Sequence, residues 1–260
     1  MVSSFSFFID NPQILTNFIS AIGIKSAPAY SENTIDYMAE TTVVNDSDFS
    51  VGGINYRYGE PVPKTEPVEN SFFRNTLFVG DSLTLGIKNN HIFPYNNVLA
   101  HHGIDPETAM TLKIIETDYG SSLTLLEAMT EYNPEQIYIM LGANGVGYMS
   151  TQSLIGSYEQ FVDDVILQHP DSKIFIQSIL PVTAEYEKNN PYHTNKKIDE
   201  ANKMLRQMCS EKKLYYLDVC EVFKDDFGDM YDHVSPSDGL HISANSYELW
   251  AEYLRCHVVE

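Results

Sequence analysis

The chain has 260 residues, more than the roughly 100 to 200 of a typical single domain, and its 43% hydrophobic content is enough for a sizeable core. Acidic residues outnumber basic ones 36 to 16, and the net charge of -20 makes nucleic acid an unfavourable partner. Neutral or cationic ligands are easier to accommodate. The three cysteines cannot all pair within one chain and match no zinc spacing, which argues against a disulfide framework.

Residues 1–70 predict an N-terminal extension followed by an acidic linker that contains several prolines. Apolar residues with helical spacing between Ile14 and Ile22 predict a short amphipathic helix that docks on the main domain or on a neighbour. Ala27-Pro28-Ala29 has the form of a signal cleavage site, but no basic segment precedes it and polar residues interrupt the apolar run. We therefore expect no transmembrane helix here.

From residue 71 onward, short apolar runs alternate with longer helical patterns, which is typical of a parallel sheet with crossover helices. The apolar runs are nearly continuous, as expected for strands that are covered on both faces. We expect strands at 76–79, 97–100, 136–141, 173–179 and 215–219, and helices at 121–132, 152–169, 196–212 and 244–256.

Four short polar segments follow these predicted strands or precede the last helix. Ser82 follows the first strand, Gly103 the second and Asn144 the third, while Asp238 and His241 come directly before the final helix. Ligands of parallel α/β sheets bind beyond the carboxyl ends of the strands. The sequence therefore predicts that these residues meet at one edge of the sheet.

The segments Gly80-Asp81-Ser82 and Asp238 to His241 can each be read in two ways. Asp and Ser after a strand commonly cap a helix, but a serine at a helix start also has an exposed oxygen near free amides. An Asp three positions before a His is common in solvated loops, but its carboxylate can also orient the imidazole as a base. The final helix could be capped by Ser243.

Asn144 offers an uncharged N–H donor that suits an oxyanion hole, although asparagine also tolerates a left-handed turn. The glycines around it do not form a dinucleotide-binding G-x-G-x-x-G pattern. Adjacent His101 and His102 point opposite ways on an extended segment and lack a third ligand at suitable spacing. We expect no cofactor and no metal ion.

In this order, the four segments resemble the SGNH, or GDSL-type, hydrolase superfamily of esterases and lipases, and its bacterial acyl-esterase members in particular. The resemblance covers about 190 residues, from Ser71 to the end. It implies a flavodoxin-like three-layer α/β/α domain over residues 71–260. It also implies a Ser82 nucleophile, a His241 base oriented by Asp238, and an oxyanion hole formed by Ser82, Gly103 and Asn144.

The resemblance predicts a serine esterase that acts on acyl esters of small molecules or carbohydrates through an acyl-enzyme intermediate. A short-chain ester, such as an acetylated saccharide, is our substrate hypothesis. Acyl transfer by the same residues and a non-catalytic binding module remain alternatives. Similarity to bacterial cell-surface esterases with acidic linkers favours an extracellular or cell-surface location, and the cytoplasm stays open. The oligomeric state is not predicted.

Overall fold

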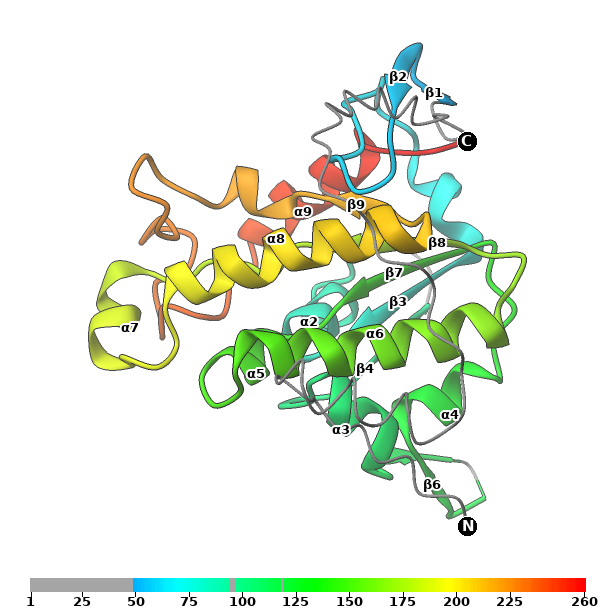
Figure 1. Ribbon diagram of the computed structural model, residues 1–260, viewed down its shortest axis with the longest axis horizontal. Helices are drawn as coiled ribbons and strands as arrows, with labels where there is room; N and C mark the ends of the chain where they lie inside the picture. The colour runs from blue at the N-terminus through cyan, green and yellow to red at the C-terminus, as the bar shows by residue number, and fades with distance from the viewer. Residues whose placement is uncertain (1–48, 94–96, 118) are drawn as a thin grey trace, which may run out of the picture. The chain divides into compact units, whose positions relative to one another are not determined.

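A sheet of five parallel strands lies at the centre of the computed structural model, which describes residues 49–93, 97–117 and 119–260 (Figure 1). The strands are ordered β4-β3-β7-β8-β9, with the first of them along the chain in second place. This is the flavodoxin-like order, and it confirms the predicted fold class. Their bounds are Thr76–Gly80 (β3), Val98–Ala100 (β4), Gln136–Met140 (β7), Lys173–Gln177 (β8) and Tyr215–Leu217 (β9).

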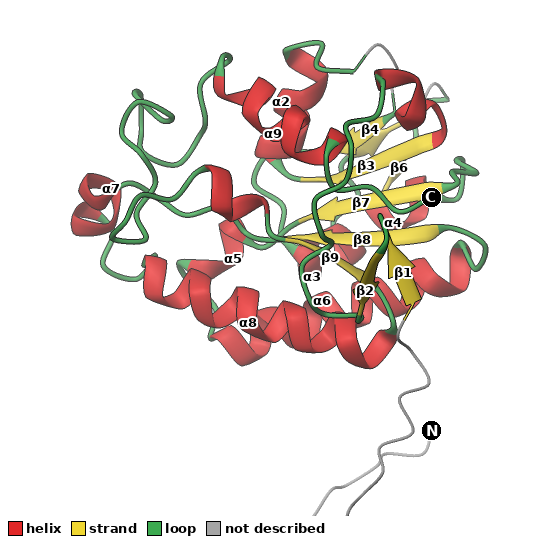
Figure 2. Ribbon diagram, turned by 90° about the horizontal axis from the view of Figure 1, so that it is seen from above, coloured by secondary structure: helices red, strands yellow, loops and turns green. Residues whose placement is uncertain are grey.

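Helices cover both faces of the sheet and complete the three layers (Figure 2). On one face lie α2 (Ser82–Asn89) and α9 (Ser246–Arg255), and on the other α6 (Thr151–Gln168) and α8 (Asn195–Lys212). The shorter helices are α3 (Pro106–Thr111), α4 (Leu125–Met129), α5 (Ala143–Val146) and α7 (Ala184–Asn189), with 3-10 turns η1 (Asn70–Asn75) and η2 (Val219–Val222).

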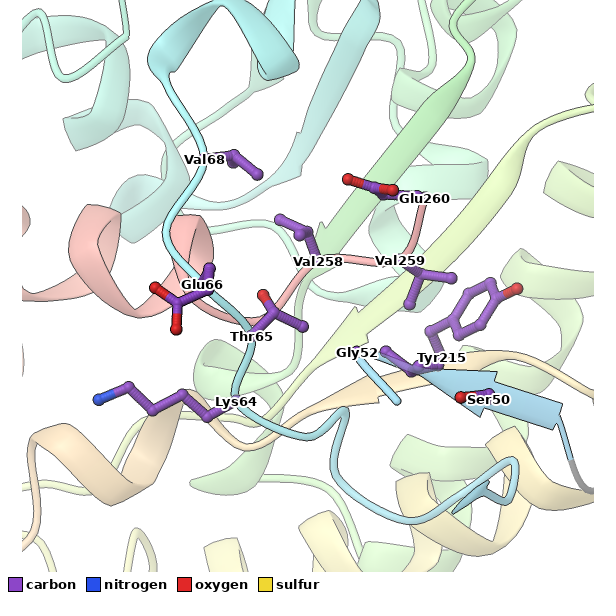
Figure 3. A pocket seen from close by; sticks show the side chains of 11 residues that line it. Ser50, Gly52, Lys64, Thr65, Glu66, Val68, Tyr215, Val258, Val259 and Glu260 are labelled. Carbon is purple, nitrogen blue, oxygen red and sulfur yellow. The ribbon is translucent and has the colours of Figure 1, made fainter. Parts of the chain in front are cut away.

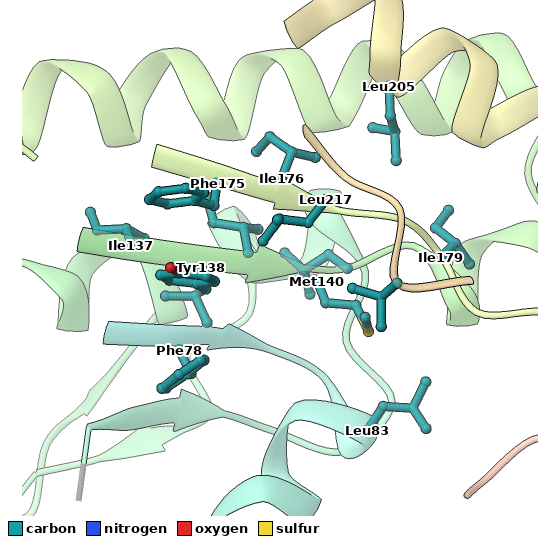
Figure 4. Packing of buried hydrophobic residues seen from close by; sticks show 14 of the residues in the cluster. Phe78, Leu83, Ile137, Tyr138, Met140, Phe175, Ile176, Ile179, Leu205 and Leu217 are labelled. Atoms are coloured by element: carbon teal, nitrogen blue, oxygen red, sulfur yellow. The ribbon is translucent and has the colours of Figure 1, made fainter. Parts of the chain in front are cut away.

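A row of aromatic side chains crosses the sheet and holds the strands in register (Figure 4). Phe78, Tyr138, Phe175 and Tyr215 occupy partnered positions on β3, β7, β8 and β9. The Tyr138 and Phe175 rings stack at a centroid distance of 4.4 Å, and those of Phe175 and Tyr215 at 4.9 Å. A slip of one residue would move this row to the opposite face, so the aromatic row fixes where each strand ends.

The predicted strands and long helices agree with the structure to within about two residues at each end, except at 121–132. Ser122–Leu123 there forms β6, which pairs with β5 (Ile115–Glu116), and α4 begins only at Leu125. Thr124 ends the strand because it forms a reciprocal capping box with Glu127. The sequence patterns did not predict α3, α5, α7 or the β5–β6 hairpin.

The prediction that Ser243 caps the last helix is wrong. Asn245 occupies the cap position and makes no side-chain capping hydrogen bond. Ser243 instead lies in a turn, where its carbonyl accepts from the Ser246 amide at 2.9 Å and its hydroxyl contacts the Ser246 hydroxyl at 2.8 Å.

The described part of the predicted extension, residues 49–70, contains an antiparallel hairpin of β1 (Phe49–Val51) and β2 (Ile54–Tyr56). Beyond the hairpin, the Val62 amide donates to the Tyr216 carbonyl at 2.8 Å on edge strand β9. The predicted helix near residues 14–22 lies outside the described residues, and the domain boundary at residue 70 stays a prediction. Within 49–93, 97–117 and 119–260, no helix has the length and apolar character needed to span a membrane.

Gly80 is the last residue of β3, and the surrounding atoms leave no room for a larger side chain at this position. A Cβ atom there would lie 2.1 Å from the Thr84 hydroxyl oxygen and 2.3 Å from the Met140 carbonyl oxygen. We expect Gly80→Ala to lower the free energy of unfolding by about 3 kcal/mol or more, because backbone must shift. Gly156→Ala is the matched control, since Gly156 lies exposed in α6 with no atom within 4 Å of the added carbon.

Urea unfolding of both variants measures this difference. Gly156→Ala should raise stability by about 0.5 to 1 kcal/mol, because alanine favours a helix interior. Equal stability of the two variants would contradict the steric argument at Gly80.

Candidate active site

Ser82 is the first residue of α2 and directly follows the buried strand β3 and Asp81. The Asp81 carboxylate caps the helix by accepting from the Leu83 amide at 2.9 Å. Since the first amides of a helix have no partner within it, the Ser82 N–H belongs to a set of donors at the positive end of the helix dipole. The cap and the candidate nucleophile are therefore adjacent residues of one turn.

The structure brings together the three residues proposed as nucleophile, base and orienting acid. Ser82 Oγ lies 2.9 Å from His241 Nε2, although the two residues are 159 positions apart. On the other side of the ring, His241 Nδ1 lies 2.7 Å from Asp238 Oδ2. A hydrogen-bond chain thus runs from the serine hydroxyl through the imidazole to the carboxylate, which is the geometry needed to remove the serine proton.

Asp238 holds its position through its second carboxylate oxygen. Oδ1 accepts from the backbone amides of His241 at 2.8 Å and Leu240 at 2.9 Å. Partial burial alone would raise the pKa of Asp238, but the hydrogen bonds from His241 and these amides outweigh it and lower the pKa below its ordinary value. The carboxylate therefore stays ionised and can stabilise a charged imidazole.

The loop that carries Ser235 supports this arrangement from behind. The Ser235 hydroxyl donates to the His241 carbonyl at 2.6 Å, which fixes the backbone of the candidate base. The side chains of His241 and Asp238 remain 43% and 48% exposed. Large substrates can therefore reach the candidate base directly from solvent.

Gly103 and Asn144 follow β4 and β7, the two strands that flank β3. Gly103 has a φ of 76°, a left-handed conformation that favours glycine. The Asn144 side-chain amide donates to the Ile104 carbonyl at 2.9 Å and to Asp81 Oδ2 at 3.2 Å. The two loops predicted to form the oxyanion hole are thus joined by a hydrogen bond, and both lie beside the turn that carries Ser82.

Asp81 has a second role that its sequence position did not reveal. It is buried, and its two oxygens link the start of α2 to Asn144. Burial raises the pKa of Asp81 to about 6, although the Leu83 hydrogen bond and the nearby His241 oppose the rise. Sequence analysis identified the capping Asp but not its contact with a residue 63 positions away.

A second bridge between the same loops was also missed. The exposed Tyr148, just beyond α5, donates its hydroxyl hydrogen to Asp105 Oδ2, while Asp105 Oδ1 caps α3 by accepting from Thr108 N at 3.0 Å. Tyr148 and Asp105 lie close in sequence to Asn144 and Gly103. This proximity was the available signal, but it does not predict a contact between two loops.

A pocket of about 780 Å³ contains none of these side chains (Figure 3). It is lined by residues 50–52, 64–66 and 258–260 together with Val68 and Tyr215. Tyr215 begins β9, so the pocket lies at the amino edge of the sheet, opposite the edge that carries Ser82. The polar groups that acyl transfer would need converge at the carboxyl edge and not in this pocket, which makes the carboxyl edge the candidate active site.

Residues 78–249, more than half of the 260-residue chain, match the model of the GDSL-like lipase/acylhydrolase family. The chain belongs to this family. GDSL-family membership supports an ester hydrolase with a serine nucleophile in general terms. No curated protein matches the chain in sequence.

Solved structures with the same fold include a GDSL-like lipase from Bacteroides thetaiotaomicron, with 14% identity, a TM-score of 0.54 and coverage of 74% of this chain and 89% of that chain. A proposed acylhydrolase from Bacteroides fragilis has 17% identity, a TM-score of 0.54 and coverage of 76% and 90%. A carbohydrate acetylesterase from Sinorhizobium meliloti has 14% identity, a TM-score of 0.50 and coverage of 70% and 96%. At these identities the likeness shows the fold alone.

Asp81 should make stability depend on pH in a defined window. Its pKa rises from 3.8 to about 6 on folding, so between these values the native state holds a proton that the unfolded chain releases. The stabilising contribution is fully present below about pH 4 and is lost as the pH rises to about 6. Relative to Asp81→Asn, the wild-type free energy of unfolding should fall by about 2 kcal/mol between pH 4 and pH 6.5.

Urea unfolding of both proteins at pH 4 and pH 6.5 measures this difference. Titrating groups that do not interact with Asp81 are shared by the two proteins, so their effects cancel in the comparison. Parallel pH dependences for wild type and variant would contradict a raised pKa at Asp81.

Proposed function

We propose that this GDSL-family chain is a serine esterase that hydrolyses short-chain acyl esters through an acyl-enzyme intermediate. The observation that carries the proposal is the hydrogen-bond chain from Ser82 Oγ to His241 Nε2 at 2.9 Å and from His241 Nδ1 to Asp238 Oδ2 at 2.7 Å. A non-catalytic module would have no need for this alignment at the start of a helix.

In the first half of the proposed reaction, His241 removes the Ser82 proton as the oxygen attacks the ester carbonyl. Asp238 stabilises the charged imidazole, which then gives the proton to the leaving alcohol. The Ser82 acyl ester remains. In the second half, His241 removes a proton from water, the hydroxide attacks the acyl carbonyl, and the serine oxygen regains its proton as the acid leaves.

The negative oxygen of both tetrahedral intermediates needs donors, which we assign to the Ser82 and Gly103 amides and the Asn144 side chain. Both hydrogens of the Asn144 amide already have acceptors, Ile104 O and Asp81 Oδ2. Of the two bonds, the one to Asp81 is longer, at 3.2 Å against 2.9 Å. We propose that substrate binding redirects this hydrogen to the oxyanion.

Two observations support an acetylated saccharide as the substrate class. The candidate base and its acid are nearly half exposed, which suits a bulky polar alcohol in the leaving position. A structural neighbour from Sinorhizobium meliloti is a carbohydrate acetylesterase. The same exposure lets water reach the acyl-enzyme, which favours hydrolysis over acyl transfer. Product analysis with free sugars as acceptors separates these two outcomes.

Ser82→Ala and His241→Ala should each lower kcat for p-nitrophenyl acetate by about 10⁴-fold or more, because the nucleophile and its base act as a unit. Both should keep the wild-type melting temperature within a few degrees, since neither side chain belongs to the core. Intact mass after treatment with a fluorophosphonate should show one adduct on wild type and none on Ser82→Ala. Full activity in either variant would reject the assigned roles.

The preference for a short acyl chain has its own test. With p-nitrophenyl esters, kcat/KM should be at least tenfold higher for acetyl than for octanoyl, because a mismatch of several methylenes in a small acyl site costs about that much. Comparable values would count against the short-chain assignment. A strong preference for octanoyl would reject it while leaving the Ser82 mechanism intact.

A further inference from the structure

A polar groove of about 440 Å³ lies beside the candidate active site, between segments 183–190 and 232–239. We call it the acid-side groove because Asp238 is one of its lining residues. Its volume falls within the range of roughly 300 to 1,000 Å³ that small-molecule sites occupy. Neither family membership nor the reaction chemistry assigns it a role.

The acid-side groove adjoins the reaction site through Asp238 and Ser235, which line the groove and both bond to His241. Asp238 lines the groove and also bonds to His241, which contacts Ser82. Because His241 returns its proton to the leaving alcohol, that alcohol must lie on the histidine side of the ester. The groove is therefore placed to receive the alcohol part of the substrate, whereas the oxyanion loops lie around Ser82 and Asn144.

The lining side chains favour a ligand with many hydroxyl groups. Asn189 and Ser237 provide an exposed amide and hydroxyl, each able to donate and accept. Tyr186 adds a half-buried aromatic ring with a polar tip, a surface that suits the mixed faces of a sugar ring.

Charge narrows the ligand class further. The carboxylates of Glu185, Asp232 and Asp238 line the groove, and its lining includes no lysine or arginine. Carboxylates accept hydrogen bonds from hydroxyl groups and repel anions. A neutral or amino-substituted sugar fits this lining, and a uronic acid or sugar phosphate does not.

Contacts within the chain hold the walls of the groove in place. The Thr183 amide donates to the Gly239 carbonyl at 2.9 Å, which ties its two walls together. Gly239 has a φ of 79°, and a Cβ there would lie 2.3 Å from the Thr183 hydroxyl and 2.8 Å from Tyr186 Cβ. On the same wall, Asn190 donates its side-chain amide to the Tyr186 carbonyl at 2.9 Å. Preformed walls lower the entropic cost of binding.

We propose that the acid-side groove binds the leaving-group saccharide of the substrate and selects neutral or cationic sugars over anionic ones. This proposal rests on the esterase function proposed above and adds the substrate class and the place where it binds. Asp238 then has two roles: it orients His241, and it lines the groove that binds the sugar.

The test compares two esters in two double variants. Asn189→Ala/Asp232→Ala removes polar groups from the groove. Asn133→Ala/Asp171→Ala, the matched control, makes the same changes at exposed positions before β7 and β8, at the opposite edge of the sheet. For 6-O-acetylglucose, kcat/KM should fall about tenfold in the groove variant, as expected for two lost hydrogen-bonding groups, and not in the control.

With p-nitrophenyl acetate, which lacks a sugar, both variants should keep the wild-type kcat/KM. Equal losses on both esters, or no loss on either, would overturn the groove assignment.

Wild type should also prefer acetylated methyl glucoside over acetylated glucuronate. The ratio of the two kcat/KM values should be smaller in the groove variant, because it lacks one carboxylate. An unchanged ratio would contradict the charge argument.

Binding to Ser82→Ala separates this proposal from the esterase proposal. Titration of 6-O-acetylglucose by calorimetry needs no turnover, and introducing the groove changes into Ser82→Ala should weaken binding about tenfold, by the same loss of hydrogen bonds. Binding that is unaffected by the groove changes, or that cannot be detected, would overturn the groove assignment. Wild type without activity on p-nitrophenyl acetate would instead reject the esterase.

Discussion

The parallel alignment of β3, β4 and β7 is the constraint on which the site depends. Gly80, the last residue of β3, is paired with Ala100 on one side and Met140 on the other, so all three strands end at one level. Ser82, Gly103 and Asn144 follow these ends within a few residues. The strand order also reverses at β3, because the chain leaves β3 towards β4 on one side and leaves β7 towards β8 on the other. Ligands of such sheets bind at this switch point, beyond the carboxyl ends of the strands.

Sheet alignment alone does not place His241, which comes from the loop before α9. The contact between α9 and α2 places His241. The Tyr247 hydroxyl donates to the Leu83 carbonyl at 3.0 Å, and a Cβ added to Gly86 would lie 1.8 Å from that hydroxyl oxygen. Such a close approach of the two helices is possible only with glycine at 86. The helix that begins at Ser82 and the helix that follows His241 are therefore held together.

Sequence patterns predicted the features that depend on local chemistry. Continuous apolar runs such as residues 137–141 indicated buried strands, and their order indicated which loops share an edge. The short helix α7 was not predicted because its six residues show too little periodicity, although Thr183 caps it. The 121–132 prediction failed because Thr124 acts as a cap while the two residues before it pair with Ile115 and Glu116.

Contacts between distant segments could not be predicted in this way. The acid-side groove joins segments 183–190 and 232–239, each of which alone reads as an ordinary polar loop. Likewise, the sequence predicts only a capping role for Asp81, because its first oxygen accepts from the Leu83 amide two positions away. Its second oxygen meets Asn144 only after β3 and β7 have paired.

Asp81 shows how the fold and the proposed chemistry compete for one residue. Burying a carboxylate is unfavourable, and the Leu83 hydrogen bond and the nearby His241 offset this cost only in part, since the pKa still rises to about 6. A neutral cap such as serine would start α2 without this penalty. The Asp81 carboxylate also bonds to Asn144, and we propose that this contact aligns the predicted oxyanion loop with the Ser82 turn. The destabilised carboxylate is then explained by the reaction geometry and not by the stability of the helix.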